Sequence, residues 1–498
     1  MTERRSASLA DLGLTAQGGA EVWLTGISAV SRTIRAGMLF AALPSAHVHG
    51  ATHLRAAMAA GAAAVLTDAE GARLAGVELQ RAGVPVALCE DARGCFARAV
   101  ALWFGAQPAT MVAVTGTNGK TSVATFTRMI WEALGHAAIN LGTTGVEGAV
   151  SAALGQTTPD PVTLHRILAD SAAQGVTHGA MEASSHGLDQ RRLDGVWLAA
   201  AGFTNLTQDH LDYHDGMDEY FEAKMGLFER LLPDEGVAAV NLDDPHGDEV
   251  ALRAAACGHE VIGVGRGEAA RLRLMGQRFE PAGQELLFSW QGARMQVHLP
   301  LVGGFQAGNA LLAAALAIGS GEDADEVFAV LPRLTTVRGR MQHAASRANG
   351  AAIYVDYAHT PDAVATALAA LRPHVMGRIT AIIGAGGDRD RTKRPLMGRA
   401  AAEAADLVIV TDDNPRSEEP ATIRAAVMAG VQEAGGEAVE IGDRAEAILR
   451  GAAGLGPGDA LIICGKGHEA GQIVGDTVYP FDDAEQASIA VAALEARA

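Results

Sequence analysis

The sequence has few cysteines for its length. Four occur in 498 residues: Cys89, Cys95, Cys257 and Cys464. Four cysteines are too few for a disulfide scaffold, and none belongs to a Cys-x-x-Cys pair, which argues against a zinc ribbon. We therefore expect four reduced cysteines with structural roles.

Positive charge is also scarce. The chain has 39 lysine and arginine residues against 58 aspartate and glutamate residues, a formal net charge of −19 at pH 7. Because such a chain repels polyanions, we expect no nucleic acid and no anionic membrane surface as its main partner. A small anionic ligand held by a local cluster of lysine and arginine remains compatible with this charge.

Long apolar segments are missing as well. No apolar segment follows the two arginines near the N-terminus, so no signal peptide is expected. A long uncharged run, residues 301–321, contains Gln306, Asn309 and several glycines. This pattern is typical of a buried strand, turn and helix rather than a membrane span. We expect a soluble, cytoplasmic protein.

The length predicts about three domains. Hydrophobic residues make up 49% of the chain and charged residues 19%, which excludes a disordered chain. Short apolar runs alternate with alanine-rich helical stretches, the pattern of an α/β fold with buried parallel strands. We predict an N-terminal domain (1–108), a central domain with a P-loop-type parallel sheet (109–337) and a doubly wound, Rossmann-like C-terminal domain (338–498). Strands are expected at 22–27, 38–43, 62–67, 84–89, 111–115, 179–181, 198–204, 237–241, 261–264, 352–356, 379–384, 407–411, 438–441 and 460–464, and helices at 51–60, 97–104, 123–133 and 309–318.

The strongest local signal is a glycine-rich loop between an apolar strand and a helix. The loop reads Gly116-Thr117-Asn118-Gly119-Lys120-Thr121-Ser122. Its backbone N–H groups and the following helix N-terminus suit a phosphate chain. Lys120 is expected to neutralise the β- and γ-phosphates of a nucleotide, and Thr121 to bind Mg²⁺. Val114 stands where the strict P-loop has glycine, and an ordinary glycine-rich turn is the alternative.

Two polar segments, 181–187 and 205–214, follow apolar strands of the predicted central sheet. Ligands bind at the carboxyl ends of such strands, and Mg²⁺ prefers oxygen ligands, so Glu182 is a candidate ligand. His210 would be an unusual ligand for a hard ion, and a hydrogen-bonded histidine at a strand end is the alternative. Lys224 lies on a predicted amphipathic helix, where a surface lysine is the alternative.

The C-terminal third contains further polar motifs, at 338–342, 356–362, 386–395, 411–416 and 464–469, and residues 303–309 open the alanine-rich helix. Four cations occur within six residues: Arg389, Arg391, Lys393 and Arg394. A solvated basic face is the alternative to an anion-binding role. The last two motifs, each by itself, are also compatible with an Asx-type turn and a glycine loop.

Together, Gly-Thr-Asn-Gly-Lys-Thr (116–121), Glu-Ala-Ser-Ser-His (182–186) and Asp-Tyr-Ala-His-Thr-Pro-Asp (356–362) resemble the marker motifs of the Mur ligase family. These are ATP-dependent, amide-forming enzymes of peptidoglycan precursor synthesis, and the resemblance extends from residue 22 to residue 472. The segment 413–416, Asp-Asn-Pro-Arg, resembles the signature of members that add meso-2,6-diaminopimelate, whereas lysine-adding members usually lack this arginine.

The resemblance implies an activity. The chain would add meso-2,6-diaminopimelate to UDP-N-acetylmuramoyl-L-Ala-D-Glu through an acylphosphate, with ATP and Mg²⁺ as cofactors. It would act as a cytoplasmic monomer in cell-wall biogenesis, and so in cell shape and division. Lys120, Glu182, His210 and Lys224 would be the catalytic residues.

The resemblance also implies binding roles. Gly116 to Ser122, Asn309 and Arg340 would contact ATP. The UDP-muramoyl-dipeptide would contact Ala29, Ser31, Thr157, Thr158, Ser184, Gln190 and Arg192. Lys224 would carry a carbamate (N6-carboxylysine) and hold Mg²⁺ with Thr121, Glu182 and His210. Diaminopimelate would contact Arg389, Asp413, Asn414, Pro415, Arg416, Gly465 and Glu469. The chain departs from the family pattern at Val30 (usually aspartate), at Ala46-His47-Val48 in a uridine loop, and at Gln306 (usually asparagine).

The implied chemistry suits these residue types. A carboxylate must attack ATP although both are anions, and Lys120 with Mg²⁺ would offset that repulsion. Water must be excluded from the acylphosphate. Diaminopimelate ends in a second ammonium–carboxylate centre, and Arg416 can bind that carboxylate bidentately, whereas lysine would leave the arginine unpaired. Glu469 could accept a hydrogen bond from the distal ammonium.

Four other functions are alternatives to diaminopimelate ligation. Arg416 argues against a lysine-adding ligase, and a UDP-type N-terminal domain argues against a folylpolyglutamate synthase. A P-loop NTPase that drives a partner would hydrolyse ATP without any amino-acid acceptor. A non-catalytic nucleotide-binding regulator would tolerate the loss of Lys120 or Glu182, and both are present.

Overall fold

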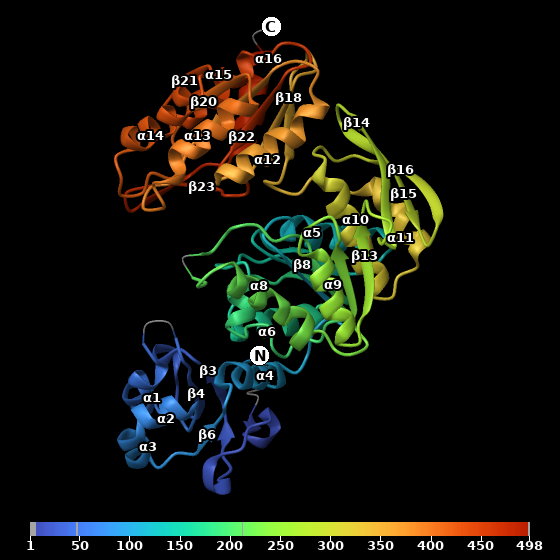
Figure 1. Ribbon diagram of the computed structural model, residues 1–498. Helices are drawn as coiled ribbons and strands as arrows, with labels where there is room; N and C mark the ends of the chain where they lie inside the picture. Colours follow the sequence, from blue (N-terminus) through green and yellow to red (C-terminus); the bar gives the residue numbers. More distant parts are fainter. Residues whose placement is uncertain (1–5, 46–47, 212, 497–498) are drawn as a thin grey trace. The chain divides into compact units, whose positions relative to one another are not determined.

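The computed structural model describes residues 6–45, 48–211 and 213–496 (Figure 1). The chain divides into two compact units. The N-terminal unit comprises residues up to Arg271 together with Leu312–Val327, and the C-terminal unit comprises Leu272–Leu311 and the residues from Phe328 onward. Among the described residues, no helix combines the length and the apolar character that a bilayer crossing requires.

The N-terminal unit begins with a four-stranded parallel sheet. Its strands, in spatial order, are β3 (Gly26–Ser28), β4 (Met38–Ala42), β5 (Ala64–Thr67) and β6 (Val86–Leu88). The helices around it are η1 (Ala10–Leu12), η2 (Gln17–Gly19), η3 (Ser31–Thr33), η4 (Gly50–His53), α1 (Leu54–Ala59), α2 (Ala69–Leu74), α3 (Gly76–Ala82) and α4 (Ala92–Phe104).

The prediction of one strand over 22–27 is wrong. The segment forms two short strands, β2 (Trp23–Leu24), which pairs with β1 (Ala7–Ser8), and β3. Thr25 separates them because its backbone N–H donates to Gly37 O (2.9 Å) and its hydroxyl donates to Ala36 O (3.0 Å). The chain therefore changes pairing partner at Thr25.

The central sheet of the N-terminal unit has the strand order β13-β12-β11-β7-β10-β8-β9. Adjacent strands are parallel except for β8 and β9, which form an antiparallel pair. The strands are β7 (Thr110–Thr115), β8 (Ala138–Gly142), β9 (Gly145–Gly148), β10 (His178–Glu182), β11 (Ala200–Phe203), β12 (Val237–Asn241) and β13 (Glu260–Gly265). The helices are α5 (Lys120–Ala133), α6 (Pro161–Ala173), α7 (Ser185–Asp189), α8 (Met217–Gly226), the π-helical η5 (Leu227–Leu231) and α9 (Gly247–Ala256).

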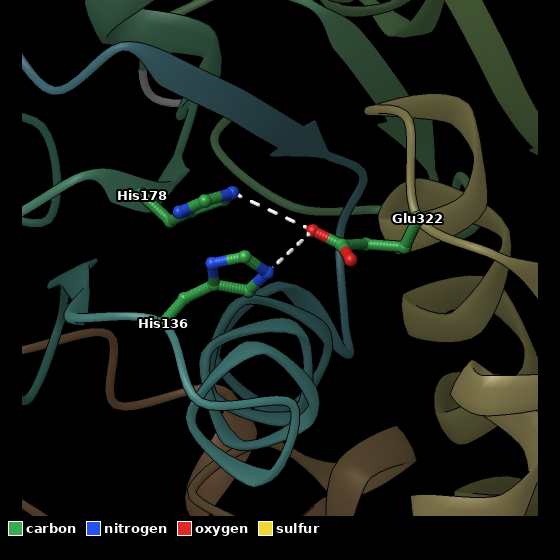
Figure 2. A group of neighbouring side chains, drawn as sticks. All are labelled: His136, His178 and Glu322. Carbon is green, nitrogen blue, oxygen red and sulfur yellow. Dashed lines mark ion pairs between the residues drawn. The ribbon is translucent and has the colours of Figure 1, made fainter.

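The two edges of this sheet carry different chemistry. The carboxyl ends of β11, β7 and β10 lead into Thr204, the glycine-rich loop and the segment after Glu182. The amino edge at β8 and β10 instead carries His136 and His178, which face Glu322 (Figure 2). In a parallel sheet the carboxyl ends of neighbouring strands lie at one edge and the amino ends at the other. This pairing gathers the loops at the carboxyl edge and the two histidines at the amino edge.

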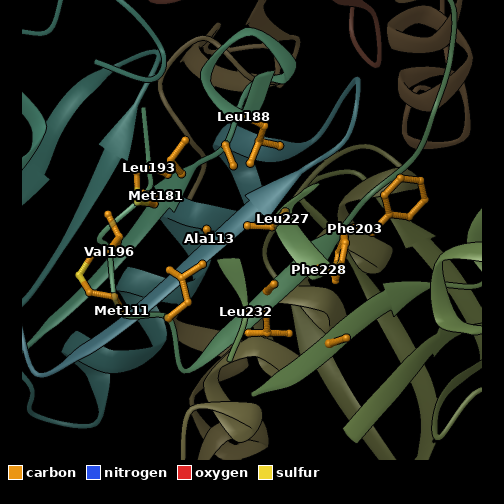
Figure 3. Close-up of a cluster of buried hydrophobic side chains, with 14 of the residues drawn as sticks. Met111, Ala113, Met181, Leu188, Leu193, Val196, Phe203, Leu227, Phe228 and Leu232 are labelled. Atoms are coloured by element: carbon orange, nitrogen blue, oxygen red, sulfur yellow. The ribbon is translucent and has the colours of Figure 1, made fainter. Parts of the chain in front are cut away.

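A continuous apolar core lies beneath the central sheet (Figure 3). Met111 and Ala113 alternate along β7 and face this core, as the period of two in a strand requires. Phe228 and other residues of the covering helices complete it, and truncation of such a side chain to alanine costs roughly 3–5 kcal/mol. The core thus holds in place the strand from which the glycine-rich loop departs.

The C-terminal unit contains an antiparallel meander that the sequence analysis missed. Its strands are β14 (Leu272–Glu280), β15 (Gly283–Trp290) and β16 (Ala293–Leu299). Turn signals were present, since Pro281-Ala282 and Gln291-Gly292 separate the strands. Their faces, however, are of mixed polarity, unlike the short apolar runs that mark buried parallel strands. Helices α10 (Phe305–Gly319) and α11 (Ala324–Val330) follow.

A six-stranded sheet forms the rest of the C-terminal unit, in the order β17-β18-β22-β19-β20-β21. Its strands are β17 (Gln342–Ser346), β18 (Ala352–Asp356), β19 (Ile379–Ile383), β20 (Leu407–Val410), β21 (Ala438–Glu440) and β22 (Ala460–Cys464), and a hairpin of β23 (Gly471–Val474) and β24 (Thr477–Pro480) follows. The helices are η6 (Leu331–Arg333), α12 (Pro361–Leu371), η7 (Arg372–His374), α13 (Lys393–Ala404), α14 (Pro420–Glu433), α15 (Arg444–Ala453) and α16 (Asp483–Glu495).

Two apolar cores cover opposite faces of this sheet. Along β22, Leu461 and Ile463 face one core, and Ile462 and Cys464 face the other. Helices on both faces of a mainly parallel sheet make the doubly wound arrangement. The predicted α/β fold class is therefore confirmed, and the antiparallel strands β9, β14 to β16 and β17 are additions to it. All four cysteines lie among the described residues and carry free thiols.

Candidate active site

The glycine-rich loop joins β7 to α5 at the carboxyl edge of the central sheet. Gly116 and Gly119 have φ values of 139° and 87°, which L side chains rarely adopt, and a Cβ at Gly116 would collide with the Thr204 hydroxyl. The N–H of Asn118 donates to Asn205 Oδ1 (2.9 Å). The loop is therefore held by the end of the neighbouring strand, and the predicted strand, loop and helix are present.

Lys120 lies in the first turn of α5 and folds back over the loop. Its Nζ donates to Gly116 O (2.9 Å) and to Thr117 O (2.8 Å). The next residues, Thr121 and Ser122, are buried at the start of the helix. The arrangement places one cation and the helix N-terminus at the same loop, as a phosphate-binding loop requires.

Lys224 of α8 is buried, with 1% of its surface exposed, so the surface-lysine alternative is wrong. Its Nζ donates to Gly116 O (2.9 Å) and lies 4.2 Å from the centroid of the Tyr220 ring. Burial and, next, the charge of Lys120 lower the pKa of Lys224 well below its usual value, while Asp209 opposes them. Two lysines thus converge on one carbonyl oxygen, and the charged form of Lys224 is less favoured than that of an exposed lysine.

Glu182 ends β10 and is buried. One carboxylate oxygen accepts from Thr143 N (2.7 Å) and the other from Thr143 Oγ1 (3.2 Å). Glycine is required at Gly142 because a Cβ there would collide with this carboxylate. The end of β8 therefore orients a carboxylate at the carboxyl edge of the sheet.

The backbone beside Glu182 belongs to a hydrogen-bonded network. Thr158 Oγ1 donates to Glu182 O (2.9 Å) and accepts from the N–H and the hydroxyl of Ser184 (3.0 Å each). Thr157 Oγ1 lies 3.0 Å from Thr143 Oγ1, the hydroxyl that contacts the Glu182 carboxylate. Three residues assigned to the muramoyl-dipeptide thus adjoin the candidate metal ligand.

Arg192 extends this network. Its Nη1 donates to Thr158 O (2.7 Å), and its Nε and Nη2 donate to Gln190 Oε1 (3.2 and 2.8 Å). Burial is the largest cause that lowers the pKa of Arg192. The structure therefore brings together Thr157 and Thr158, which precede α6, with Ser184, Gln190 and Arg192, which flank α7.

His210 lies in the loop after β11 with a φ of 54°. Its Nε2 is 3.5 Å from Asp209 Oδ2, and its ring meets that of His186 edge-on, with centroids 4.8 Å apart. Both alternatives for His210, a ligand and a hydrogen-bonded histidine, fit this placement, and its metal role stays a prediction.

His214 is a residue that the sequence analysis did not assign. It is buried, and among the described residues neither of its ring nitrogens has a hydrogen-bond partner. Burial lowers its pKa, and its ring lies 5.4 Å from that of Tyr220, centroid to centroid. The second histidine of the 205–214 segment was the available signal.

Ala29 and Ser31, assigned to the UDP end of the substrate, lie at the turn between β3 and η3. Val30, which replaces the usual aspartate, is exposed, and its N–H donates to Ser28 Oγ (3.0 Å). Ala46 and His47 lie outside the described residues. The UDP assignments stay predictions.

In the C-terminal unit, the adjacent strands β22, β19 and β20 lead into three of the predicted motifs. Asn414 Oδ1 accepts from Lys466 Nζ (2.9 Å) and from Ile473 N (3.0 Å), and its Nδ2 donates to Glu469 Oε2 (2.8 Å). Lys466 Nζ also lies 3.3 Å from Glu469 Oε2, and no part of its side chain is exposed. Lys466 had no assigned role; its place between two glycines after a strand was the signal.

Arg416 has a φ of 52° and is anchored to neighbouring loops. Its Nη1 donates to Gly387 O (2.7 Å) and its N–H to Ile473 O (3.0 Å). Gly465, with a φ of 115°, contacts buried Asp413 so closely that a Cβ would collide with its carboxylate. Three more of the assigned diaminopimelate residues therefore lie in the segments that follow neighbouring strands.

Two assigned residues of this group remain. Pro415 is buried, and Arg389 lies on the exposed part of the loop after β19, where its Nη1 donates to Asp388 O (3.1 Å). The cation run is not one solvated face. Arg391 is 73% exposed in its side chain, whereas Arg394 is buried and bonds Glu418 with two nitrogens (2.8 and 3.1 Å).

Asn309 and Arg340 also belong to the C-terminal unit. Asn309 Nδ2 donates to Gln306 Oε1 (3.0 Å) within α10, and the Arg340 guanidinium lies 4.6 Å from the Tyr357 ring centroid. Asp356 accepts from Met341 N (2.7 Å), and burial raises its pKa. The ATP contacts assigned to Asn309 and Arg340 stay predictions.

Comparison with known proteins gives consistent matches along the chain. Three family models match: "Mur ligase family, catalytic domain" at residues 24–102, "Mur ligase middle domain" at 114–317 and "Mur ligase, glutamate ligase domain" at 339–467. The chain is 49% identical over 480 residues to the UDP-N-acetylmuramoyl-L-alanyl-D-glutamate--2,6-diaminopimelate ligase of Caulobacter vibrioides, covering 95% of this chain and 96% of that one. It is also 49% identical over 477 residues to the ligase of the same name from Bradyrhizobium diazoefficiens, covering 94% and 95%.

The fold of the chain is also similar to that of a solved structure. The structure of a UDP-N-acetylmuramoyl-L-alanyl-D-glutamate--2,6-diaminopimelate ligase has a TM-score of 0.73 and 33% sequence identity, covering 99% of this chain and all of that one.

Proposed function

The chain belongs to the Mur ligase family, and from that premise we propose that it is the ATP-dependent ligase that adds meso-2,6-diaminopimelate to UDP-N-acetylmuramoyl-L-Ala-D-Glu. The observation that carries the proposal is 49% identity, over 95% of the chain, to ligases of that name. The reaction releases ADP and phosphate and forms an amide bond in a peptidoglycan precursor. All its substrates are small molecules.

The glycine-rich loop has the chemistry for acyl activation. The glutamate carboxylate attacks the γ-phosphorus of ATP, ADP leaves, and an acylphosphate forms. The amine of the incoming amino acid then attacks the acyl carbon, loses a proton, and expels phosphate. Lys120 offsets the repulsion between the carboxylate and ATP, because its ammonium lies at the loop that would carry the phosphates.

Lys224 has the properties that carbamate formation needs. Its neutral amine attacks CO₂, a nitrogen–carbon bond forms, and a proton is released. Burial and the charge of Lys120 favour that neutral form, and the product is a carboxylate in place of a cation. We assign Lys224 as the modified residue of this site.

The donor set then fits Mg²⁺. Glu182 presents a carboxylate held by Thr143, a carbamate at Lys224 would present two more oxygens, and Thr121 adds a hydroxyl. His210 would complete the set. The bound ion would neutralise phosphate charge during the transfer. The muramoyl-dipeptide contacts would come from the Thr158 network beside Glu182.

Selection of the amino acid rests on the C-terminal unit. Arg416 would bind the distal carboxylate of diaminopimelate, and Glu469 would accept from its distal ammonium. Lys466 holds Asn414 and Glu469 in one cluster, so their positions are set before the ligand arrives. We further assign the protein to the cytoplasm, as a monomer.

The test is ADP release in the presence of UDP-N-acetylmuramoyl-L-Ala-D-Glu, Mg²⁺ and ATP, with meso-diaminopimelate or L-lysine offered in parallel. Release that depends on diaminopimelate is expected. Release with lysine instead would overturn the role of Arg416. Release without any amino acid would indicate an NTPase and contradict the ligase reaction.

A further inference from the structure

Two histidines and a glutamate converge at the amino edge of the central sheet (Figure 2). His136 follows α5, His178 is the first residue of β10, and Glu322 follows α10. The Nε2 atoms of His136 and His178 lie 3.0 and 3.5 Å from the same oxygen, Oε1 of Glu322. The three ligand atoms all lie within 4.8 Å of one another. None of these residues has a part in the proposed ligase reaction.

The hydrogen bonds of Thr177 indicate how His178 is oriented. The Thr177 hydroxyl lies 2.8 Å from His178 Nδ1 and 3.3 Å from Ala137 O. In the tautomer in which Nδ1 carries the ring proton, Nδ1 donates to this hydroxyl and the hydroxyl donates to Ala137 O. Histidines that bind metals commonly donate their other ring N–H to a fixed acceptor in this way.

In that tautomer, the lone pair of His178 Nε2 faces the Glu322 carboxylate oxygen 3.5 Å away, an arrangement that a bridging cation would stabilise. His136 Nε2 points at the same oxygen from the neighbouring loop, so a third ligand is available to such a cation. The rings of the two histidines are in contact, with centroids 4.1 Å apart and planes inclined at 37°.

The two distances from the carboxylate oxygen to the histidine nitrogens fit a tetrahedral transition-metal site. With metal–ligand bonds of about 2.0–2.1 Å and tetrahedral angles, neighbouring ligand atoms lie roughly 3.3 Å apart. The distances of 3.0 and 3.5 Å bracket that value. Two imidazoles and one carboxylate suit Zn²⁺, Co²⁺ or Ni²⁺, whereas Mg²⁺ prefers ligand sets made of oxygen.

We propose that His136, His178 and Glu322 form a binding site for one divalent transition-metal ion of the zinc class. The site is distinct from the proposed Mg²⁺ site, because His178 begins β10 and Glu182 ends it, about 13 Å farther along the strand. The ion joins the segment after α10 to the loop after α5 and to β10. It acts as a structural clamp on this part of the N-terminal unit.

A titration of metal-free protein tests the proposal. The protein, with any affinity tag removed, is titrated with Zn²⁺ and with Co²⁺ in excess Mg²⁺, which occupies oxygen-rich sites. Binding is followed by calorimetry and by the visible absorption of tetrahedral Co²⁺. We expect at least one equivalent to bind, with a rise in Tm of a few degrees on Zn²⁺ addition.

The variants are His136→Gln and Glu322→Gln, which are expected to lose one equivalent or to bind it at least tenfold more weakly. His136 is partly exposed, so its replacement is expected to leave the fold intact, and circular dichroism checks this. The matched control is His298→Gln. His298 lies with Glu280 and Glu285 in a more exposed group of the C-terminal unit. This control is expected to retain the equivalent.

Three results would overturn the proposal. The first is binding by His136→Gln that equals binding by the unaltered protein in stoichiometry and affinity. The second is the loss of an equivalent in His298→Gln instead. The third is a protein that binds neither Zn²⁺ nor Co²⁺, which would indicate that a proton, not a metal ion, lies between His178 and Glu322.

Discussion

Among the described residues, Lys224 in the N-terminal unit and Lys466 in the C-terminal unit are buried near the carboxyl edge of a parallel sheet, and they differ in their partners. Lys224 donates to the carbonyl of Gly116 and lies near Lys120, and among the described residues it forms no ion pair with a carboxylate. Lys466 contacts Asn414 and the carboxylate of Glu469. A buried amine without a counter-charge is favoured in its neutral, reactive form, whereas a paired ammonium acts as a fixed charge. The neighbouring side chains therefore decide the role of each lysine: Lys224 suits chemical modification, and Lys466 suits the positioning of other side chains.

The largest expected effect comes from Lys224→Ala. Loss of the carbamate would remove an oxygen ligand for Mg²⁺, and we expect kcat to fall roughly 10³-fold, with partial recovery on addition of acetate or formate. Steady-state kinetics with all three substrates measures this. Lys466→Ala is the matched control and is expected to retain most of kcat. Full kcat in Lys224→Ala would contradict the carbamate role.

Arg416→Ala is expected to raise KM for diaminopimelate roughly 10- to 100-fold, because a charge-assisted, bidentate contact is lost. KM for ATP is expected to stay unchanged. Arg391→Ala, which removes an exposed arginine from the same unit, serves as the control. Equal increases in both KM values would contradict the assignment of Arg416 to the amino-acid pocket.

Lys466→Met separates positioning from catalysis. It leaves Asn414 and Glu469 without their cation, and we expect KM for diaminopimelate to rise about tenfold with little change in kcat. We also expect a stability loss of about 1–3 kcal/mol, measured by thermal unfolding. If Lys466 and Glu469 act as one cluster, the double variant Lys466→Met/Glu469→Gln will raise KM for diaminopimelate by less than the two single variants combined.

The smallest effect concerns acid stability. Burial lowers the pKa of His165 in the N-terminal unit and of His468 in the C-terminal unit to about 4 in each case. Between pH 6.5 and 4 the unfolded chain then binds more protons, so stability falls as pH falls through this window. The decrease in Tm between pH 6.5 and pH 4 is expected to be a few degrees smaller in His165→Gln and in His468→Gln than in the unaltered protein. An unchanged slope in both variants would contradict this account.

Most of the parallel strands could be predicted from local pattern. Val237–Asn241, Ala352–Asp356 and Ala460–Cys464 are strands within the predicted bounds, because parallel strands buried on both faces are short apolar runs. The meander of β14 to β16 could not be predicted in the same way. Its residues alternate between a packed and a solvated face, and that pattern becomes evident once the partner strands are known.

By itself, the sequence determined the α/β fold class, the strand–loop–helix at Gly116 to Ser122 and the motifs that mark the Mur ligase family, because each depends on residues that are neighbours in the chain. Only the tertiary structure decided that Lys224 is buried beside Lys120, that Lys466 pairs with Glu469 and that His136 and His178 face Glu322. Burial and charge pairing depend on residues that lie far apart in the sequence, and these two quantities set the reactivity of a lysine or a histidine.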